Sequence, residues 1–216
     1  MEDQKPVKLI VMENGMKGIT DILGVFDLKG SMVNRIVKGK NFKPSTTLKD
    51  KNLLAMNQEK LWLRFSEKDR KEILKMMRTD VKLMSKYNLM DYSLLLGIQE
   101  NPNYMDARRE YAKSNNNNNS VSLDISRVSS IASNSGEMQL VQKRFDGSRH
   151  KFLSKCGRYI YHIGIIDYLQ DFNFDKKIEN FLKFRLLMKG AGISAVPPPD
   201  YADRFLRFMR DHVIVD

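Results

Sequence analysis

Apolar residues in this chain gather in short runs, and the longest of these runs ends in a carboxylate. Residues 159–166 read YIYHIGII, and Asp167 follows directly. The length of the run and its β-branched residues predict a buried strand, with a segment of a buried helix as the alternative. A second run, LLLGI at residues 94–98, comes directly after the sequence MDYS at residues 90–93. We interpret it as a second core strand.

The two runs bring two carboxylates together if they pair as an antiparallel ladder. The start of one strand then lies beside the end of the other, so that Asp91 and Asp167 meet at one edge of the sheet. Two converging carboxylates suit a proton acceptor together with a metal ligand. The pairing of the two strands is an assumption at this point.

A spacing of three to four residues between apolar side chains predicts one clear helix. Ser66 is a candidate N-cap, because Asp69 follows three residues later as in a capping box, and Asn88 closes the helix. Its apolar stripe is expected to face the core and consists of Ile73, Met77, Val81, Met84 and Tyr87. Asp91 then falls in the loop between this helix and the strand at residues 94–98.

Shorter apolar segments predict the remaining elements. We expect strands at residues 7–12 and 25–28, and strand positions between residues 138 and 152. Residues 33–51 are basic and irregular. A last amphipathic helix is expected from Asp200, with four side chains against the core: Tyr201, Phe205, Phe208 and Met209. A polar insertion at about residues 113–136, with five consecutive asparagines and many serines, is predicted to be disordered.

Two basic segments each admit two interpretations. The strand at residues 25–28 runs into a Lys-Gly-Ser turn at residues 29–31. This turn is weak evidence for phosphate binding, because it lacks the spacing of a P-loop, and an ordinary basic turn is the alternative. Residues 181–189 read FLKFRLLMK. They suit a helix in a lipid interface, or a solvated surface helix with a buried apolar face.

Composition narrows the class of protein. The 216 residues carry a formal net charge of +11 and are long enough for one domain, or for part of a larger one. The charge favours an anionic partner, which is nucleic acid, an acidic protein or an anionic membrane surface. The single cysteine, Cys156, suits a reducing compartment, and with three histidines it makes a structural zinc site unexpected. No run of 18 apolar residues occurs, so we expect membrane contact to be peripheral.

Three motifs, in this order, resemble the phosphatidylinositol phosphate kinases. They are FDLKGS at residues 26–31, MDYSLLLGI at residues 90–98 and HIGIID at residues 162–167, with secondary matches at TLKD (47–50) and YADRF (201–205). The resemblance covers nearly the whole chain except the polar insertion. It implies an α+β fold, the C-terminal lobe of a protein-kinase-like domain with mixed or antiparallel strands and packed helices. Residues 1–216 would be the C-terminal part of the catalytic domain, with most of the N-terminal lobe missing.

The resemblance also implies roles for individual residues. Asp91 matches the catalytic aspartate that orients or deprotonates the inositol hydroxyl, and Asp167 matches the aspartate that holds Mg²⁺ on the ATP phosphates. Lys29 matches a lysine near the substrate phosphate. The backbone of the hinge strand, which would meet adenine, corresponds to Met12, Glu13 and Asn14.

The segment after Asp167 matches the substrate-specificity loop of the family. Lys176 and Lys177 would engage the lipid headgroup and the membrane, and Glu179 matches an acidic position of the 5-kinases. This favours transfer of the ATP γ-phosphate to the 5-hydroxyl of phosphatidylinositol 4-phosphate, giving phosphatidylinositol 4,5-bisphosphate. The DKK sequence at 175–177 and VNR at 33–35 also resemble kinases that act on phosphatidylinositol 3-phosphate, so that lipid remains an alternative substrate.

The expected cofactors are ATP and Mg²⁺, and the expected partners are a phosphoinositide, an anionic membrane surface and a second copy in a homodimer. We expect a cytoplasmic protein at the cytosolic face of the plasma membrane or of endomembranes. The Gly-rich loop and strand lysine of the family are absent from the sequence, so the chain alone is expected to be poorly active or inactive. A non-catalytic membrane-binding fragment is the second hypothesis. Nucleic-acid binding ranks low, because the aromatic residues fall at core-like spacings and no nucleic-acid motif occurs.

Overall fold

In the computed structural model, the described residues are 14–16, 18–19, 21–39, 42–60, 62–104, 106, 150–171 and 196–216. The elements are β1 (Ile22–Leu28), β2 (Thr47–Lys49), α1 (Asp50–Lys60), α2 (Glu67–Lys86), β3 (Leu89–Met90), β4 (Ser93–Glu100), β5 (Lys151–Leu153), β6 (Tyr159–Ile166), β7 (Gln170–Asp171) and α7 (Pro198–Phe208), which a π-helical turn (Met209–Val213) extends. The expected strand at 7–12, the expected strand positions at 138–145, the insertion and the basic segment at 181–189 lie outside the described residues.

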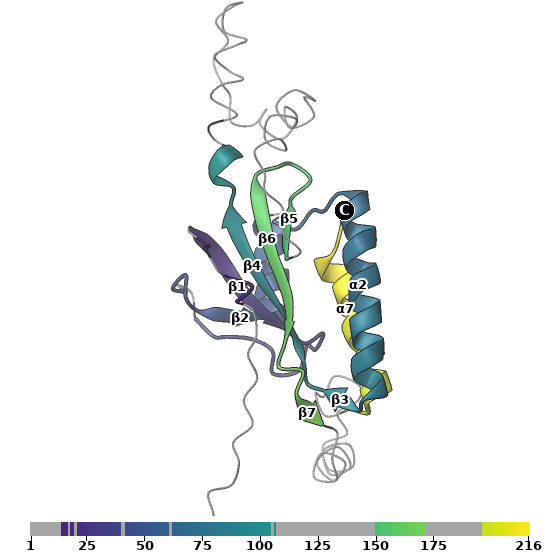
Figure 1. Cartoon of the computed structure of the whole chain (residues 1–216). Coiled ribbons are helices and arrows are strands. Elements are labelled where there is room, and N and C mark those ends of the chain that lie inside the picture. The colour runs from purple at the N-terminus through teal and green to yellow at the C-terminus, as the bar shows by residue number, and fades with distance from the viewer. Residues whose placement is uncertain are drawn as a thin grey trace, which may run out of the picture.

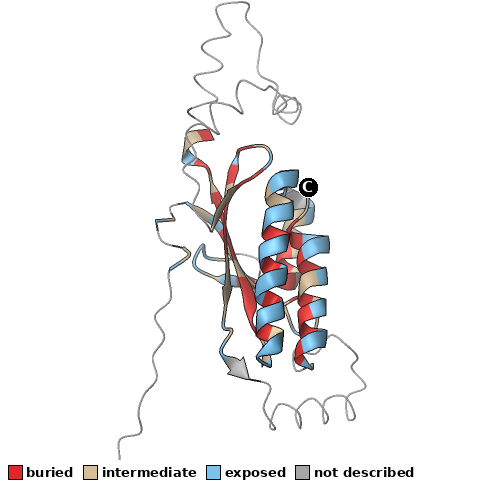
Figure 2. Cartoon of the chain, turned by 45° about the vertical axis from the view of Figure 1, so that its right-hand side comes forward, coloured by how far each residue is buried: buried red, intermediate tan, exposed pale blue. Residues whose placement is uncertain are grey.

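The layers of the molecule are a five-stranded sheet and the helices α2 and α7 (Figure 1). The five-stranded sheet has the strand order β2-β1-β4-β6-β5, in which β1 and β2 run parallel and the other neighbours run antiparallel; β3 and β7 form a separate two-stranded sheet. Helices α2 and α7 lie side by side along one face of the sheet, with their buried residues toward it (Figure 2). The described part of the chain is therefore a mixed α+β structure, as the sequence predicted.

The pairing assumed from the sequence is present. Strand β4 pairs with β6 in an antiparallel ladder that runs from Ser93 opposite Ile166 to Glu100 opposite Tyr159. Alternate residues of these strands form rows on the helix-facing side; one row joins Phe26, Leu96 and Ile163 across three strands. Phe26 and Leu96 are fully buried, and Ile163 is nearly so. Burial of this face against the helices fixes the register, because a slip by one residue would turn the apolar row to the other face.

The helix predicted between Ser66 and Asn88 is α2. The Ser66 hydroxyl accepts a hydrogen bond from the backbone N–H of Asp69 at 3.1 Å and caps the helix as expected. The predicted stripe is buried except at its last position, because Tyr87 is 62% exposed. Tyr87 is the C-cap residue, and Asn88 after it has a positive φ of 55°, so the backbone has already left the helical path there. The assignment of Tyr87 to the core was wrong for that reason.

The described part of residues 33–51, which leaves out 40 and 41, is more ordered than the sequence indicated. Strand β2 lies at the edge of the sheet, and α1 begins directly after it at Asp50. Three strand residues are too few for a visible alternation, and α1 shows no apolar stripe that a pattern search would find. None of the helices in the described ranges is both long enough and apolar enough to span a bilayer.

Candidate active site

The two predicted aspartates lie in one interruption between two ladders. The long ladder of β4 and β6 ends at Ser93 opposite Ile166, and the short ladder of β3 and β7 begins at Met90 opposite Gln170. Asp91 and Asp167 fall in the gap between these ladders, on opposite strands. The structure thus brings both to the same edge of the sheet, as the ladder hypothesis required.

Both aspartates have an unusual backbone conformation. Asp91 has a φ of 63° and Asp167 a φ of 60°, which is the left-handed region that L-residues rarely adopt. Such strain persists only where the surrounding structure enforces it, and it is concentrated at functional sites. Here the ladders on either side of the gap supply that constraint, and they turn the chain at each carboxylate.

Lys29 is in direct contact with Asp91. It follows β1, whose last residue, Leu28, lies opposite Leu94 near the start of β4. Its ammonium lies 2.8 Å from the Asp91 carboxylate and donates to the Asp91 carbonyl oxygen at 2.7 Å. The two side chains are 15% and 26% exposed, so this is a partly buried pair rather than a surface one. The pair thus places the positive charge of Lys29 beside the Asp91 carboxylate in the gap.

The turn that carries Lys29 is bound to a buried carboxylate. Asp50, at the start of α1, is 0% exposed, and its Oδ1 accepts the backbone N–H groups of Lys29, Gly30 and Ser31 at 3.1, 2.8 and 3.4 Å. Because these N–H groups point inward, they are not offered to a phosphate. The structure therefore favours the ordinary-turn interpretation of the Lys-Gly-Ser motif, in which only the Lys29 ammonium faces the site.

An arginine balances the charge of Asp50. The Arg35 Nε lies 2.6 Å from Asp50 Oδ2, and the same guanidinium binds the side chain and carbonyl oxygen of Asp27. Burial acts to lower the pKa of Arg35, but the bonds and charges of Asp50 and Asp27 outweigh it and raise the pKa. Sequence reasoning gave neither Asp50 nor Arg35 a role in the site, although Arg35 lies in the VNR match at residues 33–35. The TLKD match at residues 47–50 was the signal at Asp50, although it carried no role.

Helix α7 binds the loop that carries Asp91. The Tyr201 hydroxyl donates to the carbonyl oxygen of Tyr92, the residue after Asp91, at 2.5 Å. The rings of these two tyrosines meet edge to face, with 4.7 Å between their centroids. Burial, and next to it the Asp91 charge, raises the pKa of Tyr201 well above its ordinary value. Tyr201 therefore stays protonated and acts as a fixed donor to the loop that carries Asp91.

Asp167 could hold a metal ion. It is exposed, and it makes no hydrogen bond or ion pair with the other residues that the structure describes. Among those residues no group of three acidic, histidine or cysteine side chains gathers to enclose a metal. One exposed carboxylate fits Mg²⁺, which keeps several waters and takes most other ligands from substrate phosphates.

The remaining predicted site residues are only partly placed. Asn14 is exposed, and its side-chain oxygen accepts the backbone N–H of Met16 at 3.0 Å in a local turn. Met12 and Glu13, the other two hinge positions, lie outside the described residues. So do Lys176, Lys177 and Glu179 of the predicted specificity loop. Their roles stay predictions.

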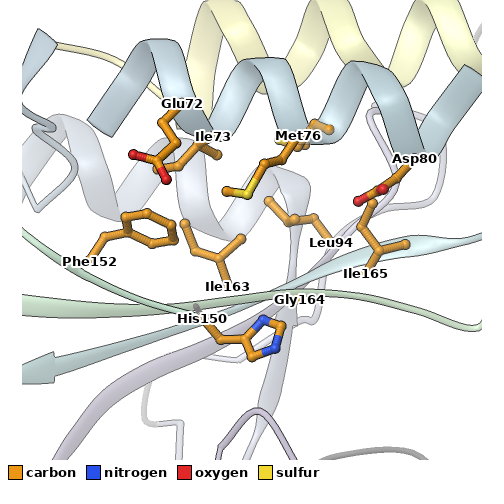
Figure 3. Close-up of a pocket in the computed structure, with 11 residues that line it drawn as sticks. Glu72, Ile73, Met76, Asp80, Leu94, His150, Phe152, Ile163, Gly164 and Ile165 are labelled. Atoms are coloured by element: carbon orange, nitrogen blue, oxygen red, sulfur yellow. The ribbon is translucent and has the colours of Figure 1, made fainter. Parts of the chain in front are cut away.

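A groove of about 430 Å³ lies elsewhere, between α2 and the sheet (Figure 3). Its walls are largely apolar, with Glu72 and Asp80 on the helix side. Partial burial raises the pKa of Asp80, although the residue as a whole is exposed. Neither of the two site aspartates nor Lys29 lines this groove. We therefore locate the candidate active site at the ladder gap and not at this groove.

Comparison with known proteins gives a consistent result. The family model described as Phosphatidylinositol-4-phosphate 5-Kinase matches residues 1–212. Phosphatidylinositol 4-phosphate 5-kinase its3 of Schizosaccharomyces pombe is 28% identical over 248 residues, which cover 97% of this chain and 32% of that protein. Phosphatidylinositol 4-phosphate 5-kinase type-1 beta of Mus musculus is 30% identical over 222 residues, or 96% of this chain and 40% of the mouse protein.

A relative whose name states a different activity is about as similar. Phosphatidylinositol 5-phosphate 4-kinase type-2 gamma of Homo sapiens is 29% identical over 234 residues, covering 96% of this chain and 53% of the human protein. The chain thus spans between about a third and about half of the length of these relatives. The match over residues 1–212 includes the three motifs at residues 26–31, 90–98 and 162–167, which form the Lys29 turn and the two sides of the ladder gap. The chain belongs to the phosphatidylinositol phosphate kinase family.

Proposed function

We propose that this chain forms the catalytic centre of a lipid kinase that transfers the γ-phosphate of ATP to the 5-hydroxyl of phosphatidylinositol 4-phosphate. The observation that carries the proposal is the ladder gap, which holds two strained aspartates on opposite strands with the Lys29 ammonium on one of them. We assign the sheet and its helices to the C-terminal lobe of a kinase-like fold. The product is phosphatidylinositol 4,5-bisphosphate.

Each residue of the gap has a separate task in this reaction. Asp91 orients the attacking inositol hydroxyl and accepts its proton as the new oxygen–phosphorus bond forms and the bond to the ADP leaving group breaks. Lys29 is within reach of a phosphate that approaches Asp91, and its charge stabilises negative charge on the transferred group. Asp167 offers its exposed carboxylate to the cation. Mg²⁺, when bound with ATP, supplies the charge neutralisation that phosphoryl transfer requires.

The choice of lipid rests on the sequence of the specificity loop. Glu179 matches the 5-kinase pattern, while the relatives include both 5-kinases and a 4-kinase. The 5-hydroxyl is therefore the finer part of the proposal. Phosphatidylinositol 3-phosphate is the second candidate substrate, favoured by the DKK sequence at 175–177 and VNR at 33–35.

Membrane binding is proposed from charge. Lys176 and Lys177, within a chain of net charge +11, would attract an anionic bilayer, since each basic residue near such a surface contributes about 1 kcal/mol. We infer from this attraction a location at the cytosolic face of the plasma membrane or of endomembranes. A homodimer would present two such surfaces to the same bilayer, so that the binding energies of the two copies act together.

One experiment tests the substrate and the reaction together. The full-length product of the gene that encodes this chain is incubated with radiolabelled ATP and, in parallel, with short-chain phosphatidylinositol 4-, 3- and 5-phosphates. The proposal expects labelling chiefly of the 4-phosphate, with the new phosphate at position 5 of the deacylated product. Dominant labelling of the 3-phosphate would select the second candidate. A protein that labels none of the three, yet floats with anionic vesicles, would be the non-catalytic membrane binder.

A further inference from the structure

Asp50 lies outside the ladder gap and carries a fully buried carboxylate, which is uncommon in proteins. It is 0% exposed, and each of its two carboxylate oxygens binds a different set of partners. One oxygen binds the three N–H groups of residues 29–31, and the other binds the Arg35 guanidinium. Buried charges persist only when paired and hydrogen-bonded, and Asp50 meets both conditions. Its partners on one side are the backbone of the very turn that carries Lys29.

The turn is held from two sides. Gly30 has a φ of 65°, and a Cβ placed on it would lie 3.0 Å from the backbone Cα of Phe205 in α7. Successive N–H groups then converge on one point, which is the arrangement that binds an anion. In this chain the anion is the Asp50 side chain. The turn therefore has little freedom to shift unless Asp50 or α7 shifts with it.

The position of Lys29 follows from this anchoring. Its own backbone N–H is bonded to Asp50 at 3.1 Å, and its ammonium at the other end of the side chain is bonded to Asp91 at 2.8 Å. A displaced turn would move the start of the Lys29 side chain and stretch its contact with Asp91. Asp50 thus acts on the candidate site through Lys29, although it touches neither Asp91 nor any reacting atom.

We propose that Asp50 is a positioning residue of this enzyme, which fixes the Lys29 turn so that the Lys29 ammonium lies on Asp91 and meets the phosphate during transfer. The inference deepens the proposed function and rests on it for the catalytic part. The part that concerns the placement of Lys29 can be measured without lipid or ATP. A purely structural role for Asp50 is the competing explanation.

The chain offers a matched control in the same turn of α1. Asn52 is also buried, at 7% exposure, and its side chain binds the backbone of Val37 and Lys49 through three hydrogen bonds of 2.8, 3.0 and 3.2 Å. Asn52→Ala therefore removes a comparable side-chain-to-backbone clamp from the same helix start. It does so without touching residues 29–31.

The first measurement follows the accessibility of Lys29. The full-length wild type, Asp50→Asn, Asp50→Glu and Asn52→Ala are labelled with dilute acetic anhydride under folded conditions, and Lys29 acetylation is quantified by mass spectrometry. Both Asp50 variants are expected to raise the Lys29 labelling rate, by about 3-fold or more, because the 15%-exposed side chain is released from Asp91. Asn52→Ala is expected to leave it unchanged. Asp50→Glu keeps the charge that Arg35 needs, so it tests placement even if Asp50→Asn does not fold.

The second measurement is a double-mutant cycle with Lys29→Met, read as the rate of phosphatidylinositol 4-phosphate phosphorylation. Asp50→Glu is expected to lower kcat about 10-fold in the wild-type background but less than about 2-fold when Lys29 is already removed. Asn52→Ala should have the same effect in both backgrounds. Unchanged Lys29 labelling in both Asp50 variants, or an Asp50→Glu effect that is equal in the two backgrounds, would overturn the proposal. If labelling rises as expected while the wild type phosphorylates no lipid, the proposed function fails and the placement of Lys29 by Asp50 stands.

Discussion

Replacing Tyr201 by phenylalanine is expected to separate support of the site from general stability. The Tyr201 hydroxyl is fully buried and donates to the carbonyl oxygen of Tyr92, one residue after Asp91. Tyr201→Phe removes that donor and leaves a buried carbonyl without it. We expect a loss of about 1–3 kcal/mol in the free energy of unfolding, because an unsatisfied buried polar group costs that much. Burial, with the Asp91 charge, raises the pKa of Tyr201 far above neutrality, so the loss should not depend on pH between 6 and 9.

A second buried tyrosine provides the control. The Tyr161 hydroxyl, on β6, donates to the Trp62 carbonyl oxygen at 2.5 Å and lies toward the other end of the sheet from the ladder gap. Tyr161→Phe should lower stability by at least as much, because the Tyr161 hydroxyl also accepts the backbone N–H of Arg64 at 3.0 Å. Only Tyr201→Phe should also lower kcat, by roughly 10-fold, because only its partner adjoins Asp91.

Urea unfolding and initial rates, measured on the same preparations, distinguish these effects. We expect reduced unfolding midpoints with unchanged slopes for both variants, together with a kcat defect confined to Tyr201→Phe. Equal kcat values for the two variants, or a Tyr201→Phe protein as stable and active as the wild type, would show that α7 does not hold the Asp91 loop.

Three further predictions follow from the described contacts. Gly30→Ala should destabilise the fold by about 1–3 kcal/mol, measured by urea unfolding, because alanine is strained at a φ of 65° and its Cβ would meet the Phe205 backbone at 3.0 Å; full stability would contradict the observed turn. Ser66→Ala should cost about 0.5–2 kcal/mol through loss of the bond to the Asp69 N–H, with no change in kcat; a kcat defect would link the helix start to the site. Partial burial raises the pKa of the Asp80 carboxyl, although the residue as a whole is exposed. The folded protein therefore binds a proton at Asp80 more tightly than the unfolded chain does, and the charged carboxylate disfavours folding above the ordinary pKa of 3.8. Solvent reduces this effect at an exposed group, so Asp80→Asn should be only slightly more stable than the wild type at pH 7, with the gain shrinking as the pH falls toward 4.

Much of the site could be predicted from local patterns. The ends of the two apolar runs could be recognised in the sequence, so Asp91 and Asp167 next to them could be identified before the strand pairing was known. Asp69 three residues after Ser66 indicated the start of α2 in the same way. In each case the signal and the structure that it forms lie within a few residues of each other.

The contacts that complete the site are non-local, and this is why they were missed. Lys29 reaches Asp91 across 62 positions of sequence, because β1 is the neighbour of β4 in the sheet. Asp50 and Arg35 each lie in a short match to the family, but the sequence does not show that they pair; the pair forms where α1 packs against β1, and there Asp50 is fully buried and Arg35 partly buried. For Tyr87 the local pattern was misleading, because the helical period was extended by one position past the end of the helix.

The central claim is that Asp91, in the gap between the two ladders, takes part in phosphoryl transfer to a phosphoinositide. The most direct measurement is the initial rate at which the full-length Asp91→Asn protein labels short-chain phosphatidylinositol 4-phosphate, compared with Asp80→Asn in the groove on α2. The account predicts a loss of about 100-fold or more for Asp91→Asn and a wild-type rate for Asp80→Asn. An Asp91→Asn rate within a few-fold of the wild type would contradict it.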